Sequence, residues 1–143
     1  MKTKIKLISI GKISPLFKEA QKYYLKKINY FADISLKEIP QSNKLTESKK
    51  ILKHFSDKSY KIVLDEKGKA LNSKEFAYKI LYSRKDISFF IGGPEGLEDF
   101  VKEKADFILS LSSFTLQHDV AQIVLLEQIF RGFNILKNTP YHK

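Results

Sequence analysis

The chain has 143 residues, no cysteine and a formal net charge of +10, from 26 Lys and Arg against 16 Asp and Glu. This length fits a single domain over residues 1–143, and the missing cysteine excludes disulfides, thiolate metal sites and cysteine nucleophiles. No apolar run approaches the roughly 20 residues of a membrane helix, and no signal-peptide core follows Met1. We therefore expect a cytoplasmic protein without a membrane partner.

The positive charge favours a polyanionic partner, because neutralising phosphates releases their bound counterions. Lys supplies 24 of the 26 cations. This predicts contacts with phosphates rather than with bases, because paired hydrogen bonds to bases come mostly from Arg. A lysine-rich composition with no role in nucleic-acid binding is the alternative.

Apolar spacing alternates along the chain between the patterns of strands and helices. In chain order we predict a strand over Lys4–Ile10, a helix over Leu16–Ile28, a strand over Ile34–Ile39, a helix over Ser42–Phe55, a strand over Tyr60–Leu64, a turn at Asp65–Gly68, a helix capped by Asn72 and ending near Tyr82, a strand over Ile87–Ile91, a helix over Glu95–Lys104, a strand over Phe107–Leu111, and a helix from about Thr115 to Leu136. The alternation predicts an α/β fold with a mostly parallel sheet and helices on both faces.

The last predicted helix is apolar almost all round, with Val120, Ile123, Val124, Leu125, Leu126, Ile129, Phe130, Phe133 and Ile135. A helix of this kind is buried on more than one side. We expect a second subunit to supply the additional surface. We also expect Thr115 to cap the start of this helix.

Two loops follow apolar strands late in the chain, and both carry residues suited to ligand binding. The first contains Gly92, Gly93 and Gly96, which let the main chain approach a ligand closely. The second is rich in hydroxyls, from Ser110 to Thr115, and opens the last helix. Ligands of open α/β sheets bind beyond the carboxyl ends of strands, so we expect the loops to form one pocket. A simple glycine turn and ordinary helix capping are the alternatives.

Several ionisable side chains accompany these loops. His118 is placed to orient a loop or contact a ligand, but it has no second histidine at helical spacing for a metal. Glu127 and Arg131 have the spacing of a surface ion pair, although an Arg on an apolar face usually meets a partner or an anion. Pro140 and Tyr141 indicate a tail that is anchored and able to reach a site.

Four motifs together resemble the RlmH (YbeA) family of bacterial 23S rRNA pseudouridine N3-methyltransferases, in the SPOUT superfamily. They are IGGPEGL at Ile91–Leu97, LSLSxxTLxH at Leu109–His118, EQIFR at Glu127–Arg131 and PYHK at Pro140–Lys143. The similarity covers the whole chain, including ISIGK from Ile8 and LDxxG from Leu64.

The resemblance implies a SPOUT fold whose C-terminal part forms a trefoil knot, a homodimer, and S-adenosylmethionine as cofactor. The cofactor contacts carried over by position are Leu64, Gly92, Leu111, Ser112, Ser113, Phe114, Thr115 and Leu116. The chain departs from the family at Gln122, where an Arg is usual.

The implied reaction methylates N3 of a pseudouridine in 23S rRNA and needs no metal. Arg131 would steady the deprotonated base or a phosphate, and His118, Tyr141 or His142 would accept the N3 proton. The dimer would bring the tail of one subunit beside the cofactor of the other. Two alternatives stay open: a non-catalytic rRNA-binding or ribosome assembly factor with this fold, and a SPOUT methyltransferase that acts on tRNA.

Overall fold

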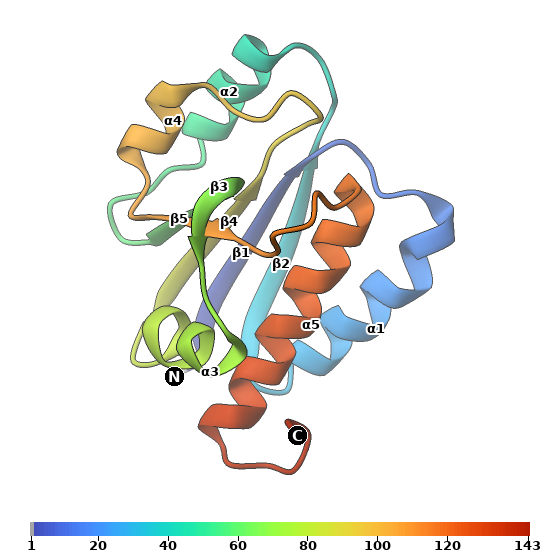
Figure 1. The fold of residues 1–143 in the computed structure, drawn as a ribbon, viewed down its shortest axis with the longest axis vertical. Helices are drawn as coiled ribbons and strands as arrows, with labels where there is room; N and C mark the ends of the chain where they lie inside the picture. Colours follow the sequence, from blue (N-terminus) through green and yellow to red (C-terminus); the bar gives the residue numbers. More distant parts are fainter. Residues whose placement is uncertain (1) are drawn as a thin grey trace.

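The centre of the protein is a sheet of five parallel strands in the order β2-β1-β4-β3-β5. We describe residues 2–143 from a computed structural model (Figure 1). The strands are β1 (Thr3–Ile10), β2 (Ala32–Ile39), β3 (Tyr60–Ala70), β4 (Asp86–Ile91) and β5 (Phe107–Ser110). The predicted α/β fold is confirmed, and the sheet is parallel throughout.

Helices cover both faces of the sheet, as predicted (Figure 1). One face carries α1 (Lys18–Ile28), α5 (His118–Leu136) and α3 (Ser73–Phe76), which continues as the π-helical turn η2 (Ala77–Leu81). The other face carries α2 (Lys44–Leu52) and α4 (Asp99–Lys104). Alternation along a strand divides the core between these layers. On β1, Ile5 and Leu7 belong to the first core, whereas Ile8 and Ile10 belong to the second.

Helix α5 is the largest helix and packs mainly against α1 and η2. Its inner side buries residues such as Leu125, Ile129 and Phe133. Ile123 and Phe130 are only partly buried at the margin of the same core. The protomer therefore leaves part of this apolar helix in contact with solvent.

The start of α5 differs from the prediction. The helix begins at His118, and Gln117 rather than Thr115 caps it, because the Gln117 side chain accepts the N–H groups of Asp119 and Val120 at 3.1 Å. The Thr115 hydroxyl donates instead to the Glu66 carboxylate at 2.8 Å. The predicted cap was wrong because a partner distant in sequence engages this hydroxyl.

The turn expected at Asp65–Gly68 was also wrong, since β3 continues to Ala70. Leu64 and Lys69 both lie opposite Leu109, so the chain bulges between them and then pairs with β5 again. Residues 65–68 thus form a bulge within a strand.

The predicted helix starts were early in three places. Helix α4 begins at Asp99, so Glu95 belongs to the loop after β4. Helix α1 begins at Lys18 after the 3-10 turn η1 (Pro15–Phe17), and α2 is trimmed to Lys44–Leu52. The cap at Asn72 is confirmed: its side chain accepts the Glu75 N–H, and Glu75 accepts the Asn72 N–H in return.

Within residues 2–143, every helix is too short or too polar to cross a membrane.

Gly68 sets how closely β3 approaches β5. A Cβ atom at Gly68 would lie 2.6 Å from the carbonyl oxygen of Ile108 and 2.7 Å from its carbonyl carbon. Both atoms belong to the main chain of β5, so the only relief is to move the two strands apart.

We expect Gly68→Ala to lower the free energy of unfolding by about 1–3 kcal/mol, as overpacking of a tight contact does. Urea unfolding followed by circular dichroism measures this change. Lys69→Ala is the matched control, because Lys69 is the exposed neighbour on the same strand. Equal stabilities of the two variants would contradict the close approach.

Candidate active site

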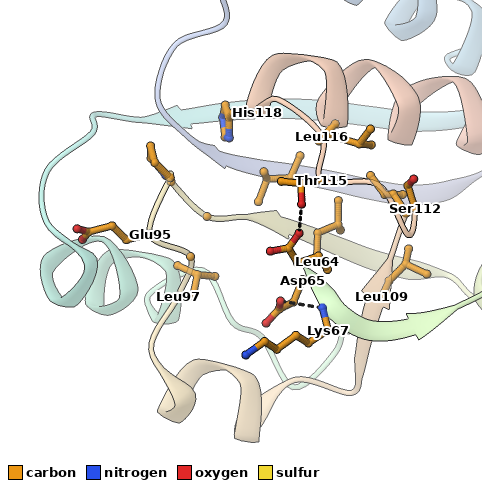
Figure 2. A pocket seen from close by; sticks show the side chains of 18 of the residues that line it. Leu64, Asp65, Lys67, Glu95, Leu97, Leu109, Ser112, Thr115, Leu116 and His118 are labelled. Carbon is orange, nitrogen blue, oxygen red and sulfur yellow. Dashed lines mark hydrogen bonds between the residues drawn. The ribbon is translucent and has the colours of Figure 1, made fainter.

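A cavity of about 430 Å³ lies beyond the carboxyl ends of β3, β4 and β5 (Figure 2). Its walls come from residues 64–67 in the bulged part of β3, residues 91–97 at the end of β4 and after it, and residues 111, 112 and 114–116 before α5, with His118 at one side. These segments are the two predicted loops and the bulge of β3. The structure therefore brings both loops to one pocket, as expected.

The pocket includes seven of the eight residues that the resemblance assigned to the cofactor. They are Leu64, Gly92, Leu111, Ser112, Phe114, Thr115 and Leu116. The eighth, Ser113, is exposed and does not line the cavity.

The glycine loop after β4 forms its wall from main chain. A Cβ at Gly92 would lie 2.8 Å from the Leu97 side chain, and one at Gly93 would lie 2.8 Å from the carboxylate of Glu47. Gly96 has a φ of +75° and donates its N–H to the Gly93 carbonyl at 2.9 Å. A Cβ atom is thus excluded at Gly92 and Gly93, which leaves the peptide groups of these two residues free to face a ligand.

The hydroxyls of the second loop mostly shape the loop itself. The Ser112 hydroxyl accepts the Phe114 N–H at 2.9 Å, and the Ser110 hydroxyl donates to the Ser112 carbonyl at 3.1 Å. The bond from Thr115 to Glu66 ties this loop to the bulge of β3 (Figure 2). The ring of Phe114 is 82% exposed at the rim and is available to a ligand or a partner.

Asp65 and Lys102 form an ion pair at the pocket wall, 2.5 Å apart. Burial alone would raise the pKa of the Asp65 carboxyl, but hydrogen bonds from Lys102 and from the Lys67 N–H outweigh it and lower that pKa. Asp65 is therefore a fixed anion whose charge is largely balanced by Lys102.

His118 lies in the cavity, in the first turn of α5. Its Nε2 atom is 3.2 Å from the hydroxyl of the buried Ser9 on β1. The neighbouring Asp119 accepts the Ser14 N–H at 3.1 Å, which ties the start of α5 to the loop after β1. These contacts give His118 a fixed orientation at the edge of the pocket.

A second cluster surrounds Glu127 near the other end of α5. The Glu127 carboxylate accepts hydrogen bonds from Arg131 Nη2 and from the Tyr141 hydroxyl, each at 2.8 Å. Arg131 also lies over the Tyr141 ring, and its Nη1 is 3.1 Å from His142 Nδ1. The tail is thus anchored, and the ion pair predicted from the spacing of Glu127 and Arg131 is present.

The structure does not bring all predicted catalytic residues together within one chain. His118 faces the cavity, whereas Arg131, Tyr141 and His142 form the tail cluster. The 13 positions that separate His118 from Arg131 along α5 correspond to roughly 20 Å of helix.

Three polar residues near the site were missed or left without a role by the sequence analysis. Glu66 had been placed in a turn, and Glu47 on a polar helix, yet Glu47 is buried against the glycine loop. The one feature of the sequence that indicates burial of Glu47 is its position one helical turn before Ile51, which is buried. Gln122, at the family's usual Arg position, is buried and accepts a hydrogen bond from the Gln21 amide at 2.6 Å.

No group of three or more metal-binding side chains occurs among the described residues 2–143.

The fold and the pocket define a class of protein: a parallel α/β protein with a loop-lined ligand site at the carboxyl edge of its sheet. A family model described as predicted SPOUT methyltransferase matches residues 3–142. The chain belongs to the SPOUT methyltransferase family.

Curated relatives carry the name of the family that the sequence motifs resemble. The chain is 35% identical over 150 residues to ribosomal RNA large subunit methyltransferase H of Pseudothermotoga lettingae, covering 97% of this chain and 99% of that one. It is 38% identical over 160 residues to the protein of the same name from Malacoplasma penetrans, covering 98% and 99%. The similarity to the RlmH family is thus confirmed over the full length of the relatives.

Two solved structures share the fold at low sequence identity. A probable methylase family protein from Haemophilus influenzae aligns with a TM-score of 0.57 at 15% identity, over 94% of this chain and 66% of that chain. A probable rRNA-methyltransferase from Porphyromonas gingivalis aligns with a TM-score of 0.58 at 12% identity, over 94% and 70%. At these identities the likeness supports the fold alone.

The Tyr141 hydroxyl provides a test of the tail cluster. Burial, together with the hydrogen bond to Glu127 and its charge, raises the pKa of Tyr141 from 10 to about 12. Because the folded-state pKa is raised, folding favours the neutral phenol. This contribution to stability is fully present below pH 10 and is lost as the pH rises through about 12.

We expect the phenolate absorbance at 295 nm, taken as wild type minus Tyr141→Phe, to appear only as the pH approaches 12. Circular dichroism at each pH verifies that the fold persists. Tyr30→Phe is the matched control for the loss of one phenol, because Tyr30 is 70% exposed. A titration midpoint near pH 10 in this difference absorbance, while the protein is still folded, would refute the anchored tail.

Proposed function

We propose that this protein transfers a methyl group from S-adenosylmethionine to N3 of a pseudouridine in 23S rRNA. The observation that carries the proposal is the cavity formed by the three loops, where seven of the eight cofactor positions of the resemblance converge. Membership of the SPOUT methyltransferase family and the names of the curated relatives support it. The net charge of +10 suits an RNA partner, and we place the activity in the cytoplasm.

The residues around the cavity fit this cofactor. Its volume is within the range of small-molecule sites. Leu64, Leu111 and Leu116 offer apolar surface to an adenine ring, and the main chain at Gly92 and Gly93 offers peptide groups. When bound, S-adenosylmethionine supplies a methyl group on a sulfonium that leaves as a neutral thioether.

We further propose that a homodimer completes the site. His118 and the tail cluster lie far apart along α5, so one protomer cannot bring them to the same base. A two-fold pairing with antiparallel α5 helices would place the tail of one subunit beside the cavity of the other. The partly buried apolar side chains of α5, such as Ile123 and Phe130, suit this interface.

The contacts that Tyr141, His142 and His118 make within one chain suggest a different role for each in proton transfer. N3 of the base must lose its proton before or during methyl transfer. The Tyr141 hydroxyl keeps its proton and donates a hydrogen bond to Glu127, so we assign Tyr141 to positioning the tail. The contact of His142 Nδ1 with Arg131 requires Nδ1 to accept, so a single ring proton lies on Nε2 and can be donated to the substrate.

His118 is the remaining candidate for the base, and it already faces the cavity. Its Nε2 contacts Ser9, which leaves Nδ1 for the substrate, directly or through water. Arg131 would hold the negative charge of the deprotonated base or a phosphate from the partner's side.

We also propose that the C-terminal segment forms the trefoil knot of the superfamily. The loop at 111–116 is bound to the bulge of β3 through Thr115 and Glu66, which suits a chain passing close to that bulge. Tracing the chain in an experimental electron-density map tests the crossing.

Methyl transfer from labelled S-adenosylmethionine to purified ribosomes tests the reaction, with mass spectrometry of 23S rRNA digests to locate the methyl group. We expect labelling of a single pseudouridine and none of bare tRNA. Labelling of tRNA would favour the tRNA enzyme. Ribosome binding without cofactor binding or labelling would favour the non-catalytic assembly factor.

Mixed dimers test whether the site is shared. Gly92→Val distorts the cavity wall, because a Cβ there would lie 2.8 Å from the Leu97 side chain, and deletion of residues 141–143 removes Tyr141 and His142 from the tail cluster. We expect each homodimer to be inactive. A purified heterodimer of the two should regain up to half of the wild-type activity, since one of its sites combines an intact cavity with an intact tail. An inactive heterodimer would place both parts of the site in one chain.

A further inference from the structure

Glu47 is a buried carboxylate that neither the fold nor the proposed reaction explains so far. It lies on α2 and is 2% exposed. Its Oε2 accepts the Ser42 N–H at 2.7 Å, and among residues 2–143 no cation lies within 4.0 Å of its carboxylate. The Ser42 N–H and the N-terminal turn of α2 stabilise this carboxylate, but no side-chain cation in the described part of the chain neutralises it, so it favours a positive charge in the space beside it.

Glu47 does not itself line the cavity, but it lies directly against a residue of the glycine loop that does. A Cβ at Gly93 would be 2.8 Å from Glu47 Oε1, so the carboxylate presses directly on the main chain of Gly93. Gly93 itself lines the cavity. One peptide segment without a side chain therefore separates a buried negative charge from the space proposed for the cofactor.

The other charges near this wall are already balanced or exposed. Lys44 pairs with Glu98, and Lys102 pairs with Asp65. Glu95 and Lys67 line the cavity but are exposed, so water and salt weaken their fields. Glu47 is the buried, unbalanced charge at this wall.

We propose that Glu47 favours a cationic ligand in the cavity and thereby discriminates the methyl donor from the product. S-adenosylmethionine carries a net charge of +1, whereas S-adenosylhomocysteine is neutral overall. The field of Glu47 stabilises the donor and not the product, so the same charge promotes loading before the reaction and release after it. This inference rests on the proposed function.

Glu47 acts through its field and through the loop, so it is a positioning residue and not a catalytic one. The loop has a separate attachment to α2, because the Ser48 hydroxyl accepts the Glu98 N–H at 2.9 Å. Glu47→Gln keeps an oxygen that can accept the Ser42 N–H and removes only the charge. The substitution thus separates the field from the support of the loop.

Isothermal titration calorimetry with three ligands tests the inference: S-adenosylmethionine, sinefungin and S-adenosylhomocysteine. Sinefungin carries an ammonium where the methyl donor has its sulfonium, so it reports charge without a transferable methyl group. We expect Glu47→Gln to weaken binding of the two cations about tenfold and of the neutral product less than twofold. Glu103→Gln removes an exposed carboxylate of α4 and is the matched control, expected to change none of the three.

Equal weakening of all three ligands would show that Glu47 only shapes the loop, and unchanged binding would show that its charge has no role. Either result overturns the inference while the proposed function stands. A wild-type protein that binds none of the ligands would instead defeat the proposed function.

A second measurement needs no variant and decides the matter if Glu47→Gln does not fold. In the wild type, the ratio of donor to product affinity should change less than twofold between 50 and 500 mM salt, because a buried charge is poorly screened. A ratio that collapses with salt would assign the preference to exposed acids such as Glu66 and Glu95 and would overturn the role of Glu47.

Discussion

Parallel pairing of all five strands is the constraint on which the site depends. Because each strand runs in the same direction, every strand ends at one edge, and the loops that follow must share that edge. The pocket walls come from the bulge of β3 and from the loops after β4 and β5, and these three strands are adjacent in the sheet. The contact between Gly68 and the main chain of Ile108 keeps β3 and β5 close enough to serve as one wall.

Helix α5 links this edge of the sheet to the tail cluster of Glu127, Arg131, Tyr141 and His142. Its first turn carries His118 beside the cavity, and its later turns carry Glu127 and Arg131, which hold the tail. The apolar residues between them form much of the first core. A rigid, well-packed helix therefore fixes the distance between the pocket and the tail cluster within a protomer, and a flexible loop could not do so. This rigidity is the physical reason why a shared site would require a second subunit.

Local patterns were sufficient to predict the features that depend on neighbouring residues. Strand and helix alternation, the cap at Asn72 and the spacing of Glu127 and Arg131 all involve partners within four residues. The meeting of the two loops at one pocket was also predictable, because strand ends in a parallel sheet converge at one edge. The motifs of the resemblance added the identity of the residues that line the pocket.

The errors arose where a distant partner decides the local structure. Thr115 has the side chain of a helix cap, but Glu66, on another strand, engages its hydroxyl. Residues 65–68 have a turn-like composition, but pairing of Lys69 and Ala70 with β5 keeps them in a strand. Glu47 has the sequence context of a surface residue, and only the packing of α2 against the glycine loop buries it. None of these contacts leaves a periodic signal along the chain.

Opposite charge requirements can coexist in this protein because screening depends on burial. The net charge of +10 resides mainly on exposed lysines, where it attracts a polyanion at long range and weakens as salt increases. An RNA substrate needs that surface, whereas a cationic methyl donor would be repelled by it. A carboxylate buried behind the glycine loop opposes the repulsion locally, where salt does not reach. Placing the anion behind the loop rather than in the pocket also keeps it from forming an ion pair with the surrounding lysines, which would cancel its field. The charge pattern that suits the RNA is thus compatible with a cofactor of the same sign.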